Sequence, residues 1–436
     1  MAAVDAARTV SFHTLGCKLN QYEANDLERQ FAERGWRIVA FGEPAGVVVV
    51  NTCTVTGRSD QRCRAALRRA RRTAPGGTVI AAGCYAEAQR EAVAALPEVD
   101  LVLGNAGKSD VFAHLDDEGR PRGGRVAAPG ATARRTFVPI RAFAGHTRAF
   151  VKIQDGCDAR CAYCIVPAAR GPNRSLGEAE VVAQVGALAA AGYREIVLTG
   201  IHLGTWGRDL APRGELAGLL GRLVELPGLE RLRLSSIEPT ELSPALVAAL
   251  AASPKICPHL HVPLQSGSTR VLAAMGRPYG PGEYAAVIGR IAAALPEPGI
   301  GADVIAGFPG EREEDFEASL ELLRGLPVTY LHVFPYSPRP GTPAAVMDGQ
   351  VPLEERERRA AALRALGREK AAAFRERHVG RVVRALVEGR PGRPASALTG
   401  NYLKIQVDAL AGDAGALREV RITRHCEGRL HGEIVR

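Results

Sequence analysis

Apolar and polar positions alternate with two different periods along roughly the first hundred residues. Three apolar runs predict strands: "TVSFHTLG" (9–16), "GVVVVN" (46–51) and "GTVIAAG" (77–83). The consecutive valines of the second run are typical of a strand that is buried on both faces. Helical patterns follow the runs, over residues 20–34, 58–72 and 86–96. This order predicts an α/β domain built on a doubly wound parallel sheet.

A second series of apolar runs begins near residue 148, and a helical pattern fills the gap after each run. Six strands are expected, over residues 149–154, 195–199, 230–235, 259–263, 300–306 and 329–334. Six strands are too few for a closed eight-stranded barrel. We therefore expect an open partial (β/α)6 barrel or a second wound sheet, with functional residues at the carboxyl ends of the strands.

The remaining segments have other patterns. Residues 116–145 are rich in Gly, Pro and Arg without periodicity, which indicates a linker. A helix over 353–377 precedes short strands with period-two alternation and Gly turns, which predict a small all-β barrel. The expected domains cover residues 8–115, 146–373 and 374–436.

The composition suits a protein of two or three domains. The chain has 436 residues, of which 46% are hydrophobic. It has no apolar run of membrane-spanning length, and its N-terminus lacks the pattern of a signal peptide, so we expect a cytoplasmic protein without membrane association. In that reducing compartment, nine unevenly spaced cysteines favour metal ligands or buried thiols over disulfides.

The charge balance favours a polyanionic partner. The net charge is +9, although arginine far outnumbers lysine and a GC-rich genome would produce the same bias. Residues 374–436 hold eleven Arg and one Lys against seven acidic residues, a net charge of +5, which favours RNA binding by the predicted barrel. The predicted helix 58–72 carries seven arginines, and it is either a solvated helix or a phosphate-contacting face.

A cysteine follows each of the first three predicted strands: Cys17, Cys53 and Cys84. The carboxyl ends of parallel strands lie on one edge of a sheet, so these thiols, 36 and 31 positions apart, should converge. Three unrelated buried cysteines are the alternative, but their occurrence at three of three strand ends favours a metal site with three thiolate ligands. Cys63 and Cys426 do not fit this pattern, and we interpret them as structural.

Three more cysteines lie close together in "DGCDARCAYC", residues 155–164: Cys157, Cys161 and Cys164. Zinc sites and cubane clusters normally have four protein ligands, and no fourth cysteine is near. This C-x3-C-x2-C motif, placed after the first strand of a six-stranded β/α unit, resembles that of the radical S-adenosylmethionine enzymes. The resemblance implies a 4Fe–4S cluster whose open iron binds S-adenosylmethionine and cleaves it to a 5′-deoxyadenosyl radical. Tyr163 matches an aromatic residue that is common in that family.

The resemblance extends over nearly the whole chain. "TLGCKLNQYEAND", "NTCTVT", "AAGCYAE" and "HVPLQSGS" are similar to motifs of the methylthiotransferases, which carry an N-terminal domain, a radical barrel and an RNA-binding barrel known as TRAM. It implies an auxiliary 4Fe–4S cluster on Cys17, Cys53 and Cys84. "GCKLNQYE" resembles the branch that acts on N6-threonylcarbamoyladenosine next to the anticodon of tRNA.

The implied reaction replaces C2–H of adenine by a methylthio group and consumes two molecules of S-adenosylmethionine. An electron donor of flavodoxin or ferredoxin type is expected, and the sulfur donor stays open. Three alternatives remain: action on isopentenyladenosine in tRNA, action on an aspartate of a ribosomal protein, and a non-catalytic iron–sulfur protein that binds RNA. A basic barrel would repel a basic ribosomal protein, which disfavours the second alternative.

The predicted strand ends contain further candidate site residues. Thr199 and Gly200 would present backbone to the methionyl group of S-adenosylmethionine, and Glu238 would bind its amino or ribose groups. The alternatives are simple turn geometry for the glycine and an ordinary loop carboxylate for Glu238. His202, His259 and His261 are interpreted as packed or hydrogen-bonded side chains.

Three residues are candidates for contacts with the RNA. Arg339 in "SPRPGTP" follows the sixth predicted strand, and a guanidinium is suited to the threonylcarbamoyl carboxylate. Tyr402 could stack on a base beside Lys404 in the C-terminal barrel. An exposed loop arginine and a core tyrosine are the alternatives for Arg339 and Tyr402.

Overall fold

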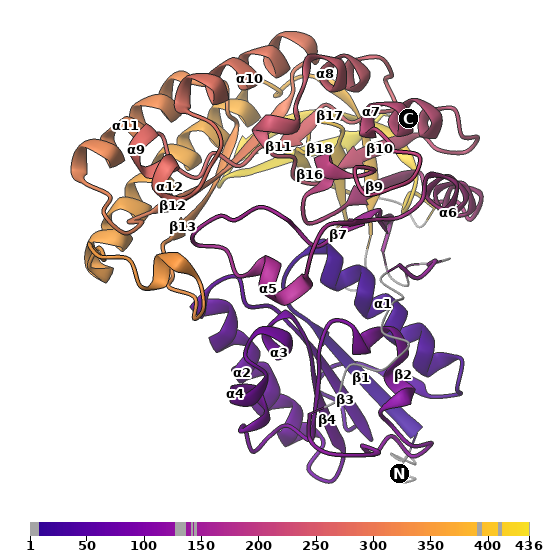
Figure 1. Ribbon diagram of the computed structural model, residues 1–436. Coiled ribbons are helices and arrows are strands. Elements are labelled where there is room, and N and C mark those ends of the chain that lie inside the picture. The colour runs from indigo at the N-terminus through magenta and orange to yellow at the C-terminus, as the bar shows by residue number, and fades with distance from the viewer. Residues whose placement is uncertain are drawn as a thin grey trace. The chain divides into compact units, whose positions relative to one another are not determined.

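The computed structural model describes residues 8–126, 137–140, 143, 146–389, 395–408 and 412–435. The expected linker over residues 116–145 therefore lies partly outside the described residues. The chain divides into two compact units (Figure 1). Unit 1 contains Met1–Ile140, Asp155–Asn173 and Pro338–Thr342, and unit 2 contains Arg141–Gln154, Arg174–Ser337 and Pro343–Arg436. The segment with the three clustered cysteines thus belongs to the same unit as the N-terminal sheet.

Unit 1 is built on a five-stranded parallel sheet in the order β2-β1-β3-β4-β5. Its strands are β1 (Thr9–Thr14), β2 (Arg37–Val39), β3 (Val47–Thr52), β4 (Thr78–Gly83) and β5 (Leu101–Leu103). Its helices are α1 (Lys18–Ala32), α2 (Gly57–Thr73), α3 (Cys84–Ala88), α4 (Arg90–Ala94), the 3-10 helix η2 (Gly107–Ala113) and α5 (Val166–Arg170). The expected helix over 86–96 is therefore two short helices, α3 and α4.

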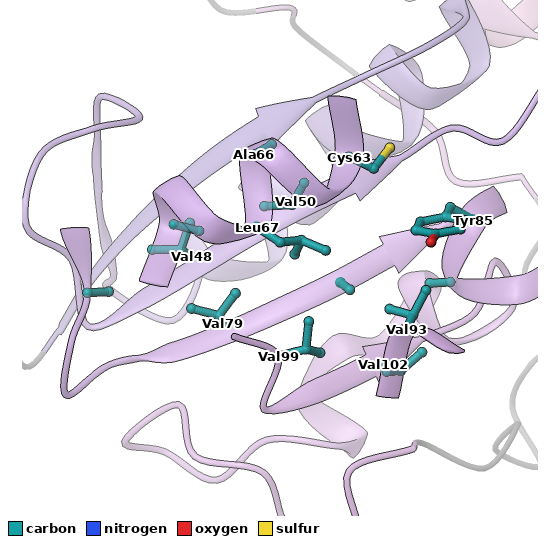
Figure 2. Close-up of a cluster of buried hydrophobic side chains, with 14 of the residues drawn as sticks. Val48, Val50, Cys63, Ala66, Leu67, Val79, Tyr85, Val93, Val99 and Val102 are labelled. Atoms are coloured by element: carbon teal, nitrogen blue, oxygen red, sulfur yellow. The ribbon is translucent and has the colours of Figure 1, made fainter. Parts of the chain in front are cut away.

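The valine run of β3 explains why the sheet is covered on both faces. Val48 and Val50 pack with Cys63, Ala66 and Leu67 of α2 in one hydrophobic cluster (Figure 2). The intervening valines of β3 pack on the other face, with Leu27 and Phe31 of α1. Since alternate side chains of a strand point to opposite faces, a continuous apolar run is what a doubly wound sheet requires. The predicted fold of this part is confirmed.

Unit 2 holds six parallel strands in two three-stranded sheets, ordered β10-β9-β6 and β11-β12-β13. The strands are β6 (Arg148–Lys152), β9 (Glu195–Thr199), β10 (Arg231–Leu234), β11 (His259–His261), β12 (Gly299–Ala306) and β13 (Tyr330–Pro335). The intervening helices are α6 (Glu178–Ala190), α7 (Leu216–Val224), α8 (Pro244–Ala251), α9 (Thr269–Ala274), α10 (Pro281–Ala294) and α11 (Glu313–Gly325), which lie outside the sheets in Figure 1. This is the expected partial barrel.

The C-terminal part of unit 2 is a closed five-stranded barrel in the order β14-β15-β16-β18-β17. Its strands are β14 (Val382–Glu388), β15 (Ser396–Thr399), β16 (Lys404–Val407), β17 (Leu417–Cys426) and β18 (Arg429–Ile434). It follows helix α12 (Leu353–Glu376), as expected from the sequence. Among the described residues, none of the helices combines the length and the apolar content that a transmembrane span requires.

Candidate metal centres

The three N-terminal cysteines lie at one edge of the sheet of unit 1. Cys53 directly follows β3, Cys84 is the first residue of α3 after β4, and Cys17 immediately precedes α1. Since β1, β3 and β4 are parallel neighbours, their carboxyl ends place the three residues at this edge. Desolvation raises the pKa of the Cys17 thiol, and the nearby guanidinium of Arg170 opposes that rise.

The three thiols are close enough to influence one another. The pKa of Cys53 is raised to about 11, chiefly by burial. The neighbouring thiols of Cys17 and Cys84 contribute to the same rise. Three thiolates that repel one another need a shared cation to remain ionised together. The arrangement therefore fits a metal centre, and thiolate sulfur is the donor type that iron–sulfur clusters use.

Two neighbours fix the position of Cys53. Gly16 has a φ of +99°, and a Cβ atom on this residue would lie 2.7 Å from Cβ and 2.9 Å from Sγ of Cys53. The Cys63 thiol donates to the carbonyl of Cys53 at 3.3 Å and accepts from its N–H at 3.4 Å. Cys63 thus holds the backbone of Cys53, in line with its interpretation as a structural cysteine.

The second group of cysteines lies on an irregular loop between β7 (Gln154–Asp155) and α5. Cys157, Cys161 and Cys164 are all partly exposed. The N–H of Cys164 donates to the carbonyl of Cys161 at 3.0 Å, and the N–H of Ala159 donates to Sγ of Cys157 at 3.4 Å. Hydrogen bonds to sulfur stabilise a thiolate and tune the potential of a bound iron–sulfur cluster. The loop therefore offers three partly exposed thiols, and the sulfur of Cys157 accepts a hydrogen bond from the backbone.

Arg170, at the end of α5, is a buried residue that sequence analysis did not single out. Its guanidinium donates to Asn20, Glu23 and Asp155, at 2.8, 2.8 and 3.1 Å. Glu23 also pairs with the buried Lys108. The only sequence signal was an arginine in the otherwise apolar stretch that follows the cysteine motif.

In unit 2, the residues expected to bind S-adenosylmethionine lie at strand ends. Thr199 ends β9 and is buried, and a Cβ atom on Gly200 would lie 2.7 Å from Oε1 of Gln154. That oxygen accepts from the N–H of His202 at 2.8 Å, so the glycine is needed for close backbone packing. Oε2 of Glu238 pairs with Arg277, which leaves Oε1 as its candidate ligand atom.

Three neighbouring strands carry a polar cluster that sequence analysis missed in part. Nε2 of His261 and Nδ1 of His332 bond to the same oxygen of Asp303, at 2.8 and 3.3 Å. Burial alone would raise the pKa of Asp303, but the hydrogen bonds from the two histidines outweigh burial and lower it. His261 is hydrogen-bonded, which agrees with the expectation that it is a packed or hydrogen-bonded side chain. Asp303 lies within β12, where an aspartate between the apolar residues Ala302 and Val304 was the available signal.

Two of the three candidates for contacts with RNA have partners within the protein, Arg339 and Tyr402. Arg339 is buried in unit 1, where Nη2 donates to Thr54 at 2.8 Å and pairs with Asp60. The alternative of an exposed loop arginine is therefore wrong, and contact with the threonylcarbamoyl carboxylate stays a prediction. The ring of Tyr402 stacks on His259 with 4.2 Å between ring centroids, so that face is not available to a base. Lys404 is exposed on β16, as a phosphate contact would require.

Comparisons with known proteins agree with this architecture. Residues 9–104 match the uncharacterized protein family UPF0004, and residues 151–323 match the radical SAM superfamily. The chain is 40% identical over 403 residues to the threonylcarbamoyladenosine tRNA methylthiotransferase MtaB of Aquifex aeolicus, covering 91% of this chain and 96% of that protein. It is 36% identical over 438 residues to the tRNA-2-methylthio-N(6)-dimethylallyladenosine synthase of Cereibacter sphaeroides, covering 98% of each.

The chain belongs to the radical SAM methylthiotransferase family. It also shares its fold with the radical S-adenosylmethionine methyltransferase TsrM of Kitasatospora setae, with a TM-score of 0.58 and 18% identity over 78% of this chain and 77% of that one. Membership makes this methylthiotransferase an enzyme that uses a 4Fe–4S cluster and S-adenosylmethionine. The cysteine thiols of the loop between β7 and α5 and of the sheet edge in unit 1 provide the sulfur donors that iron–sulfur clusters use.

Proposed function

We propose that this methylthiotransferase converts N6-threonylcarbamoyladenosine, next to the anticodon of tRNA, to its 2-methylthio derivative. The observation that carries the proposal is the 40% identity, over 91% of the chain, to the enzyme named for that nucleoside. The synthase named for dimethylallyladenosine is 36% identical. The motif "GCKLNQYE" around Cys17 supports the same choice of substrate. Such an enzyme would work in the cytoplasm, where its tRNA is.

Two 4Fe–4S clusters are proposed, each with three cysteine ligands. Cys157, Cys161 and Cys164 would hold the cluster that binds S-adenosylmethionine, and Cys17, Cys53 and Cys84 would hold the auxiliary cluster. Residues 8–115, 146–373 and 374–436 would serve as the auxiliary-cluster domain, the radical domain and the RNA-binding barrel, joined by a linker over 116–145. Two molecules of S-adenosylmethionine would be consumed per turnover, and an electron donor of flavodoxin or ferredoxin type would supply the reducing equivalents.

The C2–H bond of adenine is not acidic, so acid–base catalysis by side chains cannot activate it. When bound, the clusters and S-adenosylmethionine supply the one-electron chemistry that this bond requires. The protein's part is to bind and orient. The backbone at Thr199 and Gly200, Oε1 of Glu238 and the ring of Tyr163 would position S-adenosylmethionine. A side chain at position 200 would collide with Gln154, so this backbone conformation requires glycine.

The substrate is tested by deleting the gene and digesting bulk tRNA to nucleosides for mass spectrometry. We expect 2-methylthio-N6-threonylcarbamoyladenosine to disappear and the unthiolated nucleoside to accumulate. Loss of the methylthio derivative of isopentenyladenosine instead would assign the enzyme to the other tRNA substrate. An unchanged nucleoside profile with loss of methylthio-aspartate from a ribosomal protein would refute a tRNA substrate altogether.

The clusters are tested on protein reconstituted without oxygen, which should bind about eight irons, four for each cubane cluster. Replacing Cys157, Cys161 and Cys164 by Ala should halve the iron and abolish cleavage of S-adenosylmethionine. Replacing Cys17, Cys53 and Cys84 should halve the iron and leave unproductive cleavage measurable. The matched control replaces Cys257 and Cys426 and should keep the iron content, while Cys63 is left in place because it holds the backbone of Cys53. Full iron in the second triple variant would contradict an auxiliary cluster.

A further inference from the structure

One guanidinium in unit 1 connects the two groups of cysteines. Arg170 lies six positions after Cys164 in the sequence, and only 5% of the residue is exposed. Its Nη2 donates to Oδ1 of Asn20 and its Nη1 to Oε1 of Glu23, both at 2.8 Å. These two residues belong to α1, the helix that begins directly after Cys17. Arg170 is thus anchored to the element that carries the first cysteine of the sheet edge.

The same Nη1 group also donates to Oδ1 of Asp155 at 3.1 Å. Asp155 lies two residues before Cys157. The side chain of Arg170, which follows the cysteine loop, therefore contacts the residue that precedes the loop. The N–H of Cys157 donates to the carbonyl of Gly171 at 3.0 Å, which closes the loop at the same place. A planar guanidinium that binds three partners at once fixes their geometry, whereas a lysine ammonium would act as a single point charge.

Arg170 is also close to two of the sheet-edge thiols. Burial alone would lower the pKa of Arg170, but Glu23, Cys84 and Asp155 outweigh burial and raise it, and Cys17 acts in the same direction. A second path joins the same elements. The side-chain amide of Asn105 donates to the carbonyl of Ala169 at 2.7 Å and contacts Sγ of Cys84 at 3.6 Å. The end of α5 is therefore attached to the surroundings of both Cys17 and Cys84.

Charge pairing explains why these ionised side chains can be buried together, but it does not explain which segments they come from. Glu23 already has a buried cation, Lys108, at its other oxygen. Arg170 adds a second cation, and Asp155 adds a second anion, so the network is neutral and stays inside the protein. Its distinctive property is that its members come from α1, β7, α5 and η2, which include the segments flanking both cysteine groups.

We propose that Arg170 is a positioning residue for methylthiolation: it fixes the loop of Cys157, Cys161 and Cys164 on the sheet edge of Cys17 and Cys84, and places a permanent cation beside that edge. The proposal rests on the proposed function, because two metal centres that act on one carbon atom need a fixed mutual position. A displacement of about 1 Å at a reacting centre can reduce a rate about 100-fold.

Three variants separate position from charge. Arg170→Lys keeps the cation and loses the planar fork, and Arg170→Met loses both. The control is Arg71→Lys, which changes another arginine of unit 1 whose carboxylate partner, Asp100, also binds the N–H of Val79 in β4. That partner lies near the amino end of β4, while the cysteines follow the carboxyl ends of their strands.

The first measurement is hydrogen exchange on the metal-free protein. Amides of residues 155–173 should exchange at least about tenfold faster in both Arg170 variants and at the original rate in Arg71→Lys, because only the former release the loop. Equal acceleration throughout unit 1 would reduce Arg170 to a general stabilising residue and overturn the proposal. If Arg170→Met does not fold, Arg170→Lys and Glu23→Gln carry the same test.

The second measurement is made on the reconstituted enzyme. The iron content should be unchanged in Arg170→Lys, while the ratio of 5′-deoxyadenosine released to methylthiolated nucleoside formed should rise about 100-fold. Arg170→Met should in addition lower the reduction potential of the cluster at the sheet edge, because a nearby cation favours the reduced state.

An unchanged ratio and unchanged exchange in Arg170→Met would overturn the proposal. If the wild-type enzyme modifies no threonylcarbamoyladenosine, the substrate proposal fails while the exchange experiment still decides the role of Arg170.

Discussion

At the scale of single residues, the positions of the cysteines could be predicted, whereas most of the side-chain partners could not. Cys17, Cys53 and Cys84 follow strands, and the geometry of a parallel sheet brings strand ends together. Arg339 pairs with Asp60, which lies 279 positions away in the sequence. No local pattern specifies such a pair, because it depends on how distant segments pack. The same reason explains why Arg170 was missed.

Gly16 provides a prediction at this scale. Gly16→Ala should lower the iron bound at the sheet edge, because the added Cβ would collide with Cβ and Sγ of Cys53. The matched control is Gly35→Ala: Gly35 also has a positive φ, +77°, but nothing lies within 4 Å of the added atom. Both variants carry the same kind of backbone strain, about 1 kcal/mol. Iron content and thermal unfolding are measured together, and equal iron loss in both variants would contradict the collision argument.

At the scale of elements, the pattern of apolar residues located the strands that it predicted to within a few residues, but it missed the short strands β2, β5 and β15. It also did not show which polar side chains meet across the strands. His261, Asp303 and His332 come from β11, β12 and β13. Asp303 and His332 are direct neighbours in the parallel register, and Ala302 and Val304 on the opposite face of β12 are buried. The cluster therefore arises from register, which a single sequence does not specify.

This cluster should contribute to the pH dependence of stability. The hydrogen bonds from His261 and His332 hold the pKa of Asp303 below its unfolded value of about 3.9, so the contribution is present above that value and is lost as pH falls through the folded pKa. Asp303→Asn should lower the free energy of unfolding of the metal-free protein by about 1–2 kcal/mol at pH 7. Its stability should then fall less steeply than that of the wild type between about pH 5 and pH 3, a window set by that unfolded value.

Denaturant unfolding at several pH values measures the effect. Asp348→Asn, which changes an exposed aspartate of unit 2, is the control and should follow the wild-type curve. Parallel curves for the wild type and Asp303→Asn would show that the two histidines do not stabilise the ionised carboxylate.

At the scale of the whole molecule, the C-terminal barrel is attached to the radical domain within unit 2 by buried arginines. Arg231 donates to the carbonyl of Leu398 at 2.8 Å, and Arg233 donates to those of Thr399 and Gly400 at 3.0 and 2.8 Å. Both arginines also pair with the buried Glu195. Deleting the barrel would remove those carbonyl partners from buried cations, which is costly. A deletion would therefore confuse loss of RNA binding with loss of stability, and surface substitutions are the sharper test.

The exposed charges of the barrel indicate which surface would meet tRNA. Lys404, Arg424 and Arg429 lie on β16, β17 and β18, which are neighbours in the barrel, and all three are exposed. By contrast, Arg381 pairs with Glu297 of the radical domain. Replacing each of the three by Gln should weaken tRNA binding and reduce the slope of log K against log salt by about 0.7 to 0.9 for each phosphate that is no longer neutralised. Arg381→Gln removes the same net charge and should leave the slope unchanged. Equal effects in all four variants would mean that net charge, and not this surface, determines the affinity for tRNA.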